Sequence, residues 1–329
     1  MNKKFGVEII GVGSYLPDKI LTNADLEKMV DTSDEWITTR TGIKERRIAD
    51  KDSATSDLAA NAAKKAIENA GIKPEDIDLI IVATITPDLQ FPSTACFVQK
   101  KVGIKKAGCF DISAACSGFI YGLGCAKSML ESGDFSMCLL IGAETLSRVT
   151  NWKDRSTCVL FGDGAGAMIL KRTDKENNIL SIYLDSDGTY TDILMIPAGG
   201  SKLPATIETV QKDMHFIQMN GKEVFKFAVV KMVEATYKAI EMCNKKIEEI
   251  SLIIPHQANM RIIDAMRERL NVPPEKIFVN LQKYGNMSSA TTIVALDEAI
   301  NQNIVKKGDL VELVAFGGGL TWASTVIRL

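Results

Sequence analysis

Residues 66–81 have the sequence AIENAGIKPEDIDLII, and residues 239–254 have the sequence AIEMCNKKIEEISLII. Aligned without gaps, the two stretches are identical at nine of sixteen positions, at an offset of 173 residues. The first copy belongs to a longer pattern that predicts a helix over 56–70, a C-cap at Gly71 and a buried strand over 78–84. One match of this kind can arise from composition alone, because helix–turn–strand units resemble one another.

Two further pairs of segments match at the same offset. Residues 116–118 (CSG) correspond to 289–291 (SAT), and residues 137–142 (MCLLIG) correspond to 310–315 (LVELVA). Three matches in one register indicate a duplicated domain. Because helix-like and strand-like segments alternate along the chain, the predicted fold class is α/β.

The two copies are expected to join in a polar run at 171–178, which divides the chain into an N-terminal half, 1–172, and a C-terminal half, 173–329. Within the second half, residues 185–220 are rich in Gly, Thr and Asp and have no counterpart in the first half. We interpret them as a loop-rich insertion, a kind of segment that often shapes a binding site. An amphipathic helix is predicted over 223–244.

Composition limits the classes of function. The 329 residues are 46% hydrophobic, with 39 Lys and Arg against 41 Asp and Glu, so no broad positive surface is expected for nucleic acid or an anionic membrane. The longest uncharged apolar stretch, 112–126, is too short to cross a bilayer. Glu8 interrupts the apolar run that a signal peptide would need. We therefore expect a cytoplasmic protein.

Seven cysteines without a Cys-x-x-Cys pair, in a chain of this size, argue against a disulfide framework. His215 and His256 are the only histidines, which argues against a His-rich zinc site. Three glycine-rich segments, at 11–13, 161–167 and 316–321, lack the features of dinucleotide or phosphate loops. They are interpreted as tight turns, or as backbone N–H donors to an anionic oxygen.

Cys116 lies where a predicted strand ending near residue 113 meets a predicted helix over 117–130. A helix N-terminus stabilises a thiolate, the nucleophilic form of cysteine, so we expect a lowered pKa. A buried structural cysteine is the alternative. A structural role is also the favoured interpretation of the cysteines that lie inside apolar runs, which are Cys109, Cys125, Cys138 and Cys158.

His256 follows the apolar run 252–255, at a strand end of the kind where ligands of α/β sheets gather. A structural histidine is the alternative. Asn286 precedes the helix that the repeat matches to the one after Cys116, although alone it would be interpreted as a cap or turn residue. His215 is expected to be a partly exposed residue of the insertion.

Several motifs in order resemble the β-ketoacyl-acyl carrier protein synthase III family of the thiolase-like superfamily. They are DISAACSG at 111–118, PHQANMR at 255–261, YGNMSS at 284–289, FGGGLTW at 316–322, TSDEWITTRTGI at 32–43 and FGDGAGA at 161–167. The resemblance covers essentially the whole chain and implies two pseudo-duplicated α/β halves in a layered αβαβα core. Ser117 and Glu268 depart from the usual pattern, the latter within the expected carrier-protein patch.

The resemblance implies an initiating condensing enzyme of type II fatty acid synthesis. A short acyl-CoA, such as acetyl-CoA, would acylate Cys116, and malonyl-acyl carrier protein would then lose CO2 and attack the acyl group. The implied triad is Cys116, His256 and Asn286, with the N–H groups of Cys116 and Gly318 as the oxyanion hole. Acyl-CoA would be a substrate, and neither a cofactor nor a metal is implied.

The resemblance also implies binding residues. The positions matched to CoA contacts are Thr32, Trp36, Arg40, Arg155, Gly221, Phe225 and Asn259. The matched carrier-protein contact is Arg261, with Lys222, Lys226 and Arg269 as neighbours. Phe91 matches a residue that enters the partner subunit's acyl pocket, which implies a homodimer. Without the resemblance, Trp36 would be a core aromatic residue and Arg155 a surface ion pair.

Three alternatives remain open at this point. A cysteine hydrolase would use Cys116 and His256 but would form no carbon–carbon bond. Another thiolase-like condensing enzyme would use a CoA-bound acceptor, and a scaffold that binds carrier protein would have lost turnover. The sequence does not determine which acyl primer is used, because pocket depth sets that choice.

Overall fold

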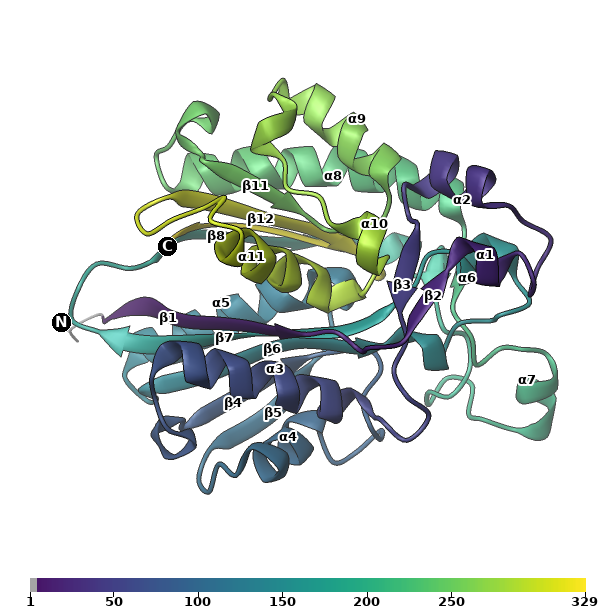
Figure 1. Cartoon of the computed structure of the whole chain (residues 1–329). Coiled ribbons are helices and arrows are strands. Elements are labelled where there is room, and N and C mark those ends of the chain that lie inside the picture. The colour runs from purple at the N-terminus through teal and green to yellow at the C-terminus, as the bar shows by residue number, and fades with distance from the viewer. Residues whose placement is uncertain (1–4) are drawn as a thin grey trace.

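The computed structural model describes residues 5–329 and contains two main β-sheets separated by helices (Figure 1). The first sheet has the strand order β1-β7-β6-β4-β5. Its β4 pairs in parallel with β5 and β6, whereas β7 runs antiparallel to β6 and β1. The strands are β1 (Gly6–Tyr15), β4 (Leu79–Ala83), β5 (Gly108–Ile112), β6 (Met137–Thr145) and β7 (Asp163–Thr173).

The second sheet has the strand order β11-β12-β13-β8. Strand β11 pairs in parallel with β12, and the remaining neighbours are antiparallel. The strands are β8 (Ile179–Ser186), β11 (Leu252–Pro255), β12 (Leu310–Gly317) and β13 (Thr321–Arg328). The first sheet therefore draws its strands from 6–173 and the second from 179–328. The division into halves at residue 172 stays a prediction, and β7 extends one residue beyond it.

Helices cover both sheets in layers. Helices α5 (Gly118–Ser132) and α11 (Thr291–Asn301) lie between the sheets and contact strands of both. Helices α3 (Thr55–Ala70) and α4 (Thr94–Val102) cover the outer face of the first sheet, and α8 (Gly221–Met242) and α9 (Met260–Leu270) cover that of the second. This is the layered αβαβα arrangement that the family resemblance implies.

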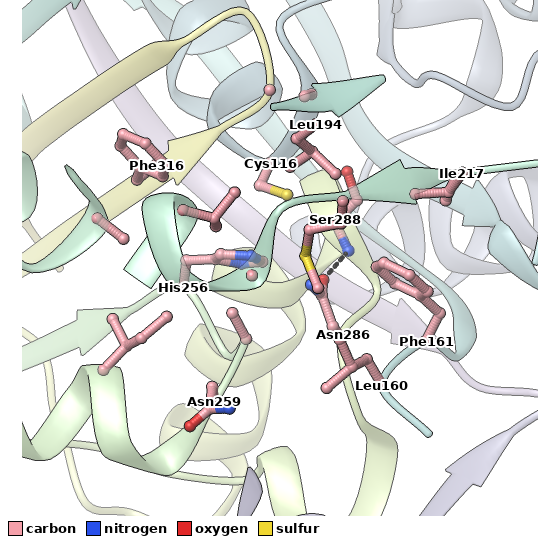
Figure 2. Close-up of a pocket in the computed structure, with 18 of the residues that line it drawn as sticks. Cys116, Leu160, Phe161, Leu194, Ile217, His256, Asn259, Asn286, Ser288 and Phe316 are labelled. Carbon is pink, nitrogen blue, oxygen red and sulfur yellow. Dashed lines mark hydrogen bonds between the residues drawn. The ribbon is translucent and has the colours of Figure 1, made fainter. Parts of the chain in front are cut away.

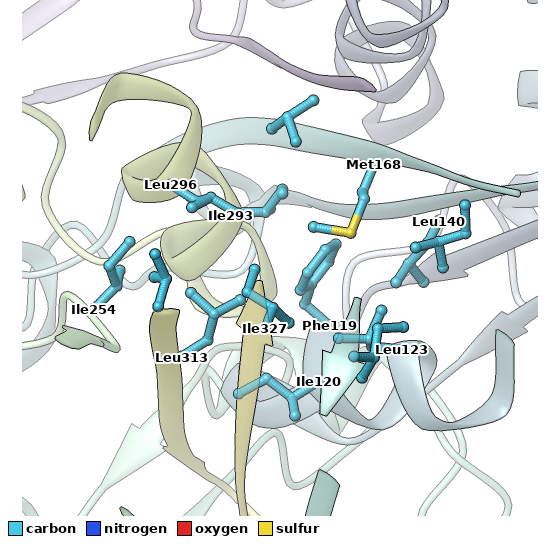
Figure 3. Packing of buried hydrophobic residues seen from close by; sticks show 14 of the residues in the cluster. Phe119, Ile120, Leu123, Leu140, Met168, Ile254, Ile293, Leu296, Leu313 and Ile327 are labelled. Atoms are coloured by element: carbon cyan, nitrogen blue, oxygen red, sulfur yellow. The ribbon is translucent and has the colours of Figure 1, made fainter. Parts of the chain in front are cut away.

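The largest core cluster fills the space between the sheets (Figure 3). Phe119 and Ile120 of α5 meet Ile293 of α11, together with Leu313 and Ile327 of the second sheet. All five side chains are fully buried, and burial of each such side chain stabilises the fold by about 1.5–3 kcal/mol. The two halves therefore share one core.

The 173-residue offset recurs in the backbone. Helices α5 and α11 begin at Gly118 and Thr291, and each follows a short 3-10 helix, Ala115–Ser117 (η2) or Ser288–Ala290 (η7). Ala115 and Ser288 both have φ of 45°, in the left-handed region that residues with a side chain rarely adopt. The two turns contact each other where the halves meet.

Smaller elements surround one end of the sheets. Residues 16–54, between β1 and α3, form a cap. The loop-rich insertion predicted over 185–220 follows the end of β8 at Ser186 and contains a two-stranded sheet and a short helix. The remaining elements are β2 (Ile20–Thr22), α1 (Asn23–Leu26), α2 (Asp34–Thr41), β3 (Glu45–Arg47), α6 (Arg155–Cys158), β9 (Leu194–Met195), α7 (Ile207–Gln211), β10 (Gln218–Met219) and α10 (Leu281–Tyr284).

Most of the predicted elements agree with the structure. The helix predicted over 56–70 is α3, and Gly71 caps it with φ of 64°. The helix predicted over 223–244 begins and ends two residues earlier. Its start is set by Asn220, whose side chain accepts a hydrogen bond from the Glu223 amide and caps the helix. Within residues 5–329, no helix is long and apolar enough to cross a membrane.

Candidate active site

A cavity of about 690 Å³ lies where the two halves meet. Cys116, His256 and Asn286 line it together, as Figure 2 shows. Around them the wall is largely apolar, and it includes Leu194 and Ile217 of the insertion. The structure therefore brings together three polar groups from distant parts of the chain in an apolar chamber, a usual form for a small-molecule site.

Cys116 occupies the 3-10 turn η2 between β5 and α5, as expected for a strand-to-helix turn. The predicted lowering of its pKa is wrong for this structure. The side chain is buried, with 8% of the residue exposed, and burial raises the pKa of the thiol to about 12. The negative charge of Glu144 raises it further, so desolvation outweighs the helix N-terminus.

The raised pKa predicts a specific pH profile for the free enzyme. Alkylation of Cys116 by iodoacetamide should accelerate about tenfold per pH unit between about pH 7 and pH 9, because the thiolate fraction rises by that factor below the pKa. Peptide mass spectrometry measures the rate at this position. The same protein in denaturant is the control, and its alkylation rate should level off above about pH 8.5, the pKa of a free cysteine. A plateau near neutral pH in the folded protein would contradict the raised pKa.

His256 follows β11 and is fixed by its own backbone and by one side chain. Its amide N–H donates to the Val314 carbonyl at 2.7 Å, and its Nδ1 lies 2.6 Å from the hydroxyl Oγ1 of Thr291. Burial lowers the pKa of the imidazole to about 3, so the ring is neutral at physiological pH. Sequence reasoning missed Thr291, because only the folded chain places the first residue of α11 beside this ring.

Asn286 is held on three sides. Its backbone N–H donates to the Leu160 carbonyl at 2.8 Å, and its carbonyl accepts from Gly162 N–H at 2.9 Å. The side-chain Oδ1 accepts from Ser288 N–H at 2.8 Å, the bond drawn in Figure 2. This bond fixes the orientation of the amide and makes its NH2 group the donor available to a ligand.

Gly318 also lines the cavity, together with Cys116. Glycine at 318 and at 317 permits two close approaches. A Cβ at Gly318 would lie 2.9 Å from the Leu194 carbonyl oxygen, whereas the close approach to the Cys116 nitrogen, at 2.6 Å, belongs to Gly317. Gly317 therefore lets the backbone approach the turn that carries Cys116, and Gly318 lets it approach the insertion.

At the outer part of the cavity, Trp36 and Arg40 of α2 line the wall. The guanidinium carbons of Arg155 and Arg40 lie 4.9 Å and 5.9 Å from the Trp36 ring centroid. Arg155 donates to the Asp31 carbonyl at 2.7 Å and is not among the lining residues. Thr32 is likewise outside the lining, but its buried hydroxyl has no hydrogen-bond partner.

The other predicted CoA contacts fall on the second half. Gly221 and Phe225 of α8 and Asn259 line the cavity. The Asn259 side chain caps α9 by accepting from Arg261 N–H and donates to the Arg40 carbonyl at 3.1 Å, so it joins the cap to α9. Both ends of its side-chain amide therefore already form hydrogen bonds within the protein.

The basic residues predicted for carrier-protein binding lie on α8 and α9, beside the outer part of the cavity. Arg261 lines the cavity, with its guanidinium carbon 5.7 Å from the Phe225 ring centroid. Lys222, Lys226 and Arg269 are exposed but do not line it. Phe91 is 84% exposed on the loop between β4 and α4 and does not line this subunit's own cavity.

The chain matches family models and curated relatives along most of its length. Two models described as 3-oxoacyl-[acyl-carrier-protein (ACP)] synthase III match residues 110–188 and, for the C-terminal region, 240–329. A β-ketoacyl-[acyl-carrier-protein] synthase III of Caldanaerobacter subterraneus subsp. tengcongensis is 59% identical over 100% of this chain and 99% of its own length. The chain belongs to the β-ketoacyl-acyl carrier protein synthase III family.

Other members of the synthase III family agree with this assignment. The Clostridioides difficile enzyme of this name is 55% identical over 100% of this chain and 99% of its own. A crystal structure of 3-oxoacyl-[acyl-carrier-protein] synthase III from Aquifex aeolicus VF5 superimposes with a TM-score of 0.91 at 51% identity, covering 98% of this chain and 100% of that one. These matches confirm the predicted thiolase-like fold and the predicted class, a condensing acyltransferase of fatty acid synthesis.

Family membership favours a condensing enzyme over the cysteine hydrolase considered from the sequence. It does not by itself assign a role to any residue, so the triad and the binding residues remain predictions. Within residues 5–329, no cluster of three or more His, Cys, Asp or Glu side chains could hold a metal ion.

Proposed function

We propose that this synthase III condenses a short-chain acyl-CoA with malonyl-acyl carrier protein and releases CoA, CO2 and 3-oxoacyl-acyl carrier protein. The observation that carries the proposal is the convergence of Cys116, His256 and Asn286 in one cavity of a family member. Each side chain supplies a different chemical capacity: a nucleophile, a neutral imidazole and an amide donor.

In the first half-reaction, the Cys116 sulfur attacks the thioester carbonyl of acyl-CoA. A Cys116 S–C bond forms, the C–S bond to CoA breaks, and the thiol proton ends on the CoA sulfur. The N–H groups of Cys116 and Gly318 stabilise the oxyanion that develops in between. Because the free thiol is protonated at neutral pH, the proton leaves it during acylation.

In the second half-reaction, malonyl-acyl carrier protein loses CO2, and the enolate carbon attacks the acyl group on Cys116. His256 Nε2 and Asn286 Nδ2 donate to the thioester oxygen, on which the enolate charge develops. Donation from Nε2 requires Nδ1 to accept, so the Thr291 hydroxyl gives its hydrogen to His256. In the structure that hydroxyl donates to the Ser288 carbonyl at 2.9 Å. Because it has one hydrogen, it gives up this bond when it donates to Nδ1.

The outer cavity would bind CoA. The Trp36 ring offers a stacking surface for adenine, and the nearby Arg40 and Arg155 offer charge-assisted bonds to phosphates. Thr32 supplies a hydroxyl near the Trp36 end of the cavity. The same cavity that contains Cys116 is also lined by Gly221, Phe225 and Asn259. This part of the wall suits the narrow pantetheine arm of CoA.

The exposed basic side chains on α8 and α9 would bind acidic acyl carrier protein. Arg261 stands at the cavity mouth, while Lys222, Lys226 and Arg269 extend the positive surface over the same two packed helices. A local patch of this kind attracts an acidic partner although the whole chain is nearly neutral.

Charge reversal tests this docking surface. The variant Arg261→Glu should raise the apparent KM for malonyl-acyl carrier protein by about tenfold, because like charges repel, and should change the KM for acyl-CoA less. Steady-state kinetics with each substrate varied measures both constants. Lys238→Glu, the same charge change at the far end of α8, is the matched control. An unchanged carrier-protein KM in Arg261→Glu would remove Arg261 from the docking site.

A homodimer is supported by two exposed features of the first half. Strand β5 is an edge of its sheet, with backbone groups open to pairing, and the nearby loop exposes Phe91 and Leu89. Phe91 of one subunit would enter the acyl pocket of the other. All seven cysteines are free, which supports the predicted cytoplasmic location.

The proposed reaction is tested with purified protein, acetyl-CoA and malonyl-acyl carrier protein. The expected product is 3-oxobutyryl-acyl carrier protein, identified by mass spectrometry, and a panel of straight and branched acyl-CoA primers then defines the preference. Malonyl-CoA in place of malonyl-acyl carrier protein distinguishes an enzyme with a CoA-bound acceptor. Absence of condensation with every primer would contradict the proposed function and leave the hydrolase and scaffold interpretations.

A further inference from the structure

Glu144, near the end of β6, is a completely buried carboxyl group beside the turn η7. Its Oε2 accepts hydrogen bonds from Thr86 Oγ1 at 2.7 Å, Ile85 N–H at 3.1 Å and Thr84 Oγ1 at 3.2 Å. Its Oε1 lies 3.0 Å from the hydroxyl of Ser289, in the second half of the chain. One carboxyl group thus joins a loop of the first half to the turn η7 of the second.

The turn η7 rests directly on β6 at this point. A Cβ at Gly142 would lie only 2.5 Å from the Ser289 carbonyl oxygen, so no side chain separates the turn from the strand. The Ser289 hydroxyl also lies 2.8 Å from the Ala83 carbonyl. The position of Ser289 is therefore set by polar contacts with two adjacent strands of the first sheet.

Ser289 is three residues from Asn286, and the connection between them is rigid. Ser288 has positive φ, and its N–H holds the Asn286 Oδ1 at 2.8 Å. Ser288 and Asn286 both line the cavity, whereas Glu144 does not. Movement of Ser289 would move the donor that orients the Asn286 amide.

The turn that carries Cys116 has separate supports. The Ser117 hydroxyl donates to the Ala114 carbonyl at 2.7 Å and lies 2.7 Å from Thr321 Oγ1 of β13. Neither contact involves Glu144. Loss of the Glu144 carboxyl should therefore displace the Asn286 side of the cavity more than the nucleophile. It also removes a negative charge that raises the pKa of the Cys116 thiol, which favours the thiolate and so does not slow acylation.

We infer that Glu144 is a positioning residue for malonyl decarboxylation, which acts through Ser289 and Ser288 to hold the Asn286 amide against the thioester oxygen. The inference rests on the proposed function, because it presumes that Asn286 stabilises the enolate. Glu144 touches neither substrate nor reacting atoms. Its effect is geometric, and displacements of about 1 Å in such donors cost up to about 10²-fold in rate.

The test measures the two half-reactions separately in Glu144→Ala, Glu144→Gln and Ser289→Ala. Self-acylation by acetyl-CoA is followed by intact mass, and decarboxylation by release of labelled CO2 from malonyl-acyl carrier protein. The matched control is Glu312→Ala, which removes an equally buried carboxyl group, bonded to Ser324 at 2.7 Å, from β12 of the other sheet. Glu312 does not line the cavity.

Glu144→Ala should decarboxylate about 10²-fold more slowly than wild type, while self-acylation should not slow by more than about threefold. Glu144→Gln should restore decarboxylation, because its amide can accept from Ile85 N–H and donate to the Ser289 hydroxyl. Ser289→Ala, a small change that preserves packing, should show the same step-selective loss in a weaker form. Glu312→Ala should affect both steps equally or neither.

Equal losses of acylation and decarboxylation in both Glu144→Ala and Ser289→Ala would overturn the inference, as would wild-type decarboxylation in both. If Glu144→Ala does not fold, the step selectivity of Ser289→Ala and the activity of Glu144→Gln decide the result. Failure of the wild-type protein to decarboxylate malonyl-acyl carrier protein is a different outcome, because it contradicts the proposed function itself.

Discussion

Cys116→Ala is expected to eliminate acyl-enzyme formation and to reduce condensation on the order of 10⁶-fold, the scale of loss when a covalent nucleophile is removed. Alanine fits the site, because the residue is buried and the side chain becomes smaller. Intact mass spectrometry after incubation with acetyl-CoA measures the acyl adduct. Wild type should gain one acetyl group and the variant none.

Cys125→Ala is the control for this experiment. Cys125 lies half-buried on α5, the helix that follows Cys116, and is not among the residues that line the cavity. Its replacement should leave the acyl adduct intact. An adduct that persisted in Cys116→Ala would place the nucleophile at another residue and would invalidate the proposed first half-reaction.

Asn286→Ala is expected to retain acylation of Cys116 but to lose decarboxylation by about 10²–10³-fold, the usual cost of one missing donor to a developing oxyanion. The amide is fixed by Ser288 N–H, so its NH2 group is already oriented in the free enzyme and needs no rearrangement. Labelled CO2 release and intact mass report on the two steps in the same samples.

Asn286→Asp sharpens this test. A carboxylate keeps the acceptor that Ser288 N–H requires, but it has no hydrogen to donate and it repels the malonyl carboxylate. Both variants should therefore fail at the same step. If acylation and decarboxylation fell together in both, Asn286 would have a general structural role and the division of labour between Cys116 and Asn286 would be refuted.

The sequence predicted much of the fold because its strongest signals are local or repeated. Helix α3 and its Gly71 cap follow from periodicity and from the one residue that adopts positive φ freely. The matched starts of α5 and α11 follow from the 173-residue offset, which also predicted that Cys116 and Asn286 stand before equivalent helices. The site was therefore predictable as a pair of turns.

Properties that depend on surroundings were not predictable from the sequence. The raised pKa of Cys116 reflects burial by residues far away in the chain, which the local helix N-terminus cannot reveal. Glu144 ends an apolar strand in the sequence IGAET and gives no sign that Ser289 lies opposite it. Acyl-primer preference belongs to the same class, because it depends on how the insertion and a partner subunit close the pocket.

Ala115 and Ser288 share an unusual backbone conformation at equivalent places in the two halves, and their turns touch. The duplication predicted from the sequence implies an ancestor in which each half presented the same turn to the same central chamber. In the proposed mechanism, the first turn carries the sulfur that holds the acyl primer, and the second orients the Asn286 amide that stabilises the malonyl enolate. The predicted duplication and the proposed roles together would make this asymmetric reaction the product of two turns that diverged on a nearly symmetric scaffold.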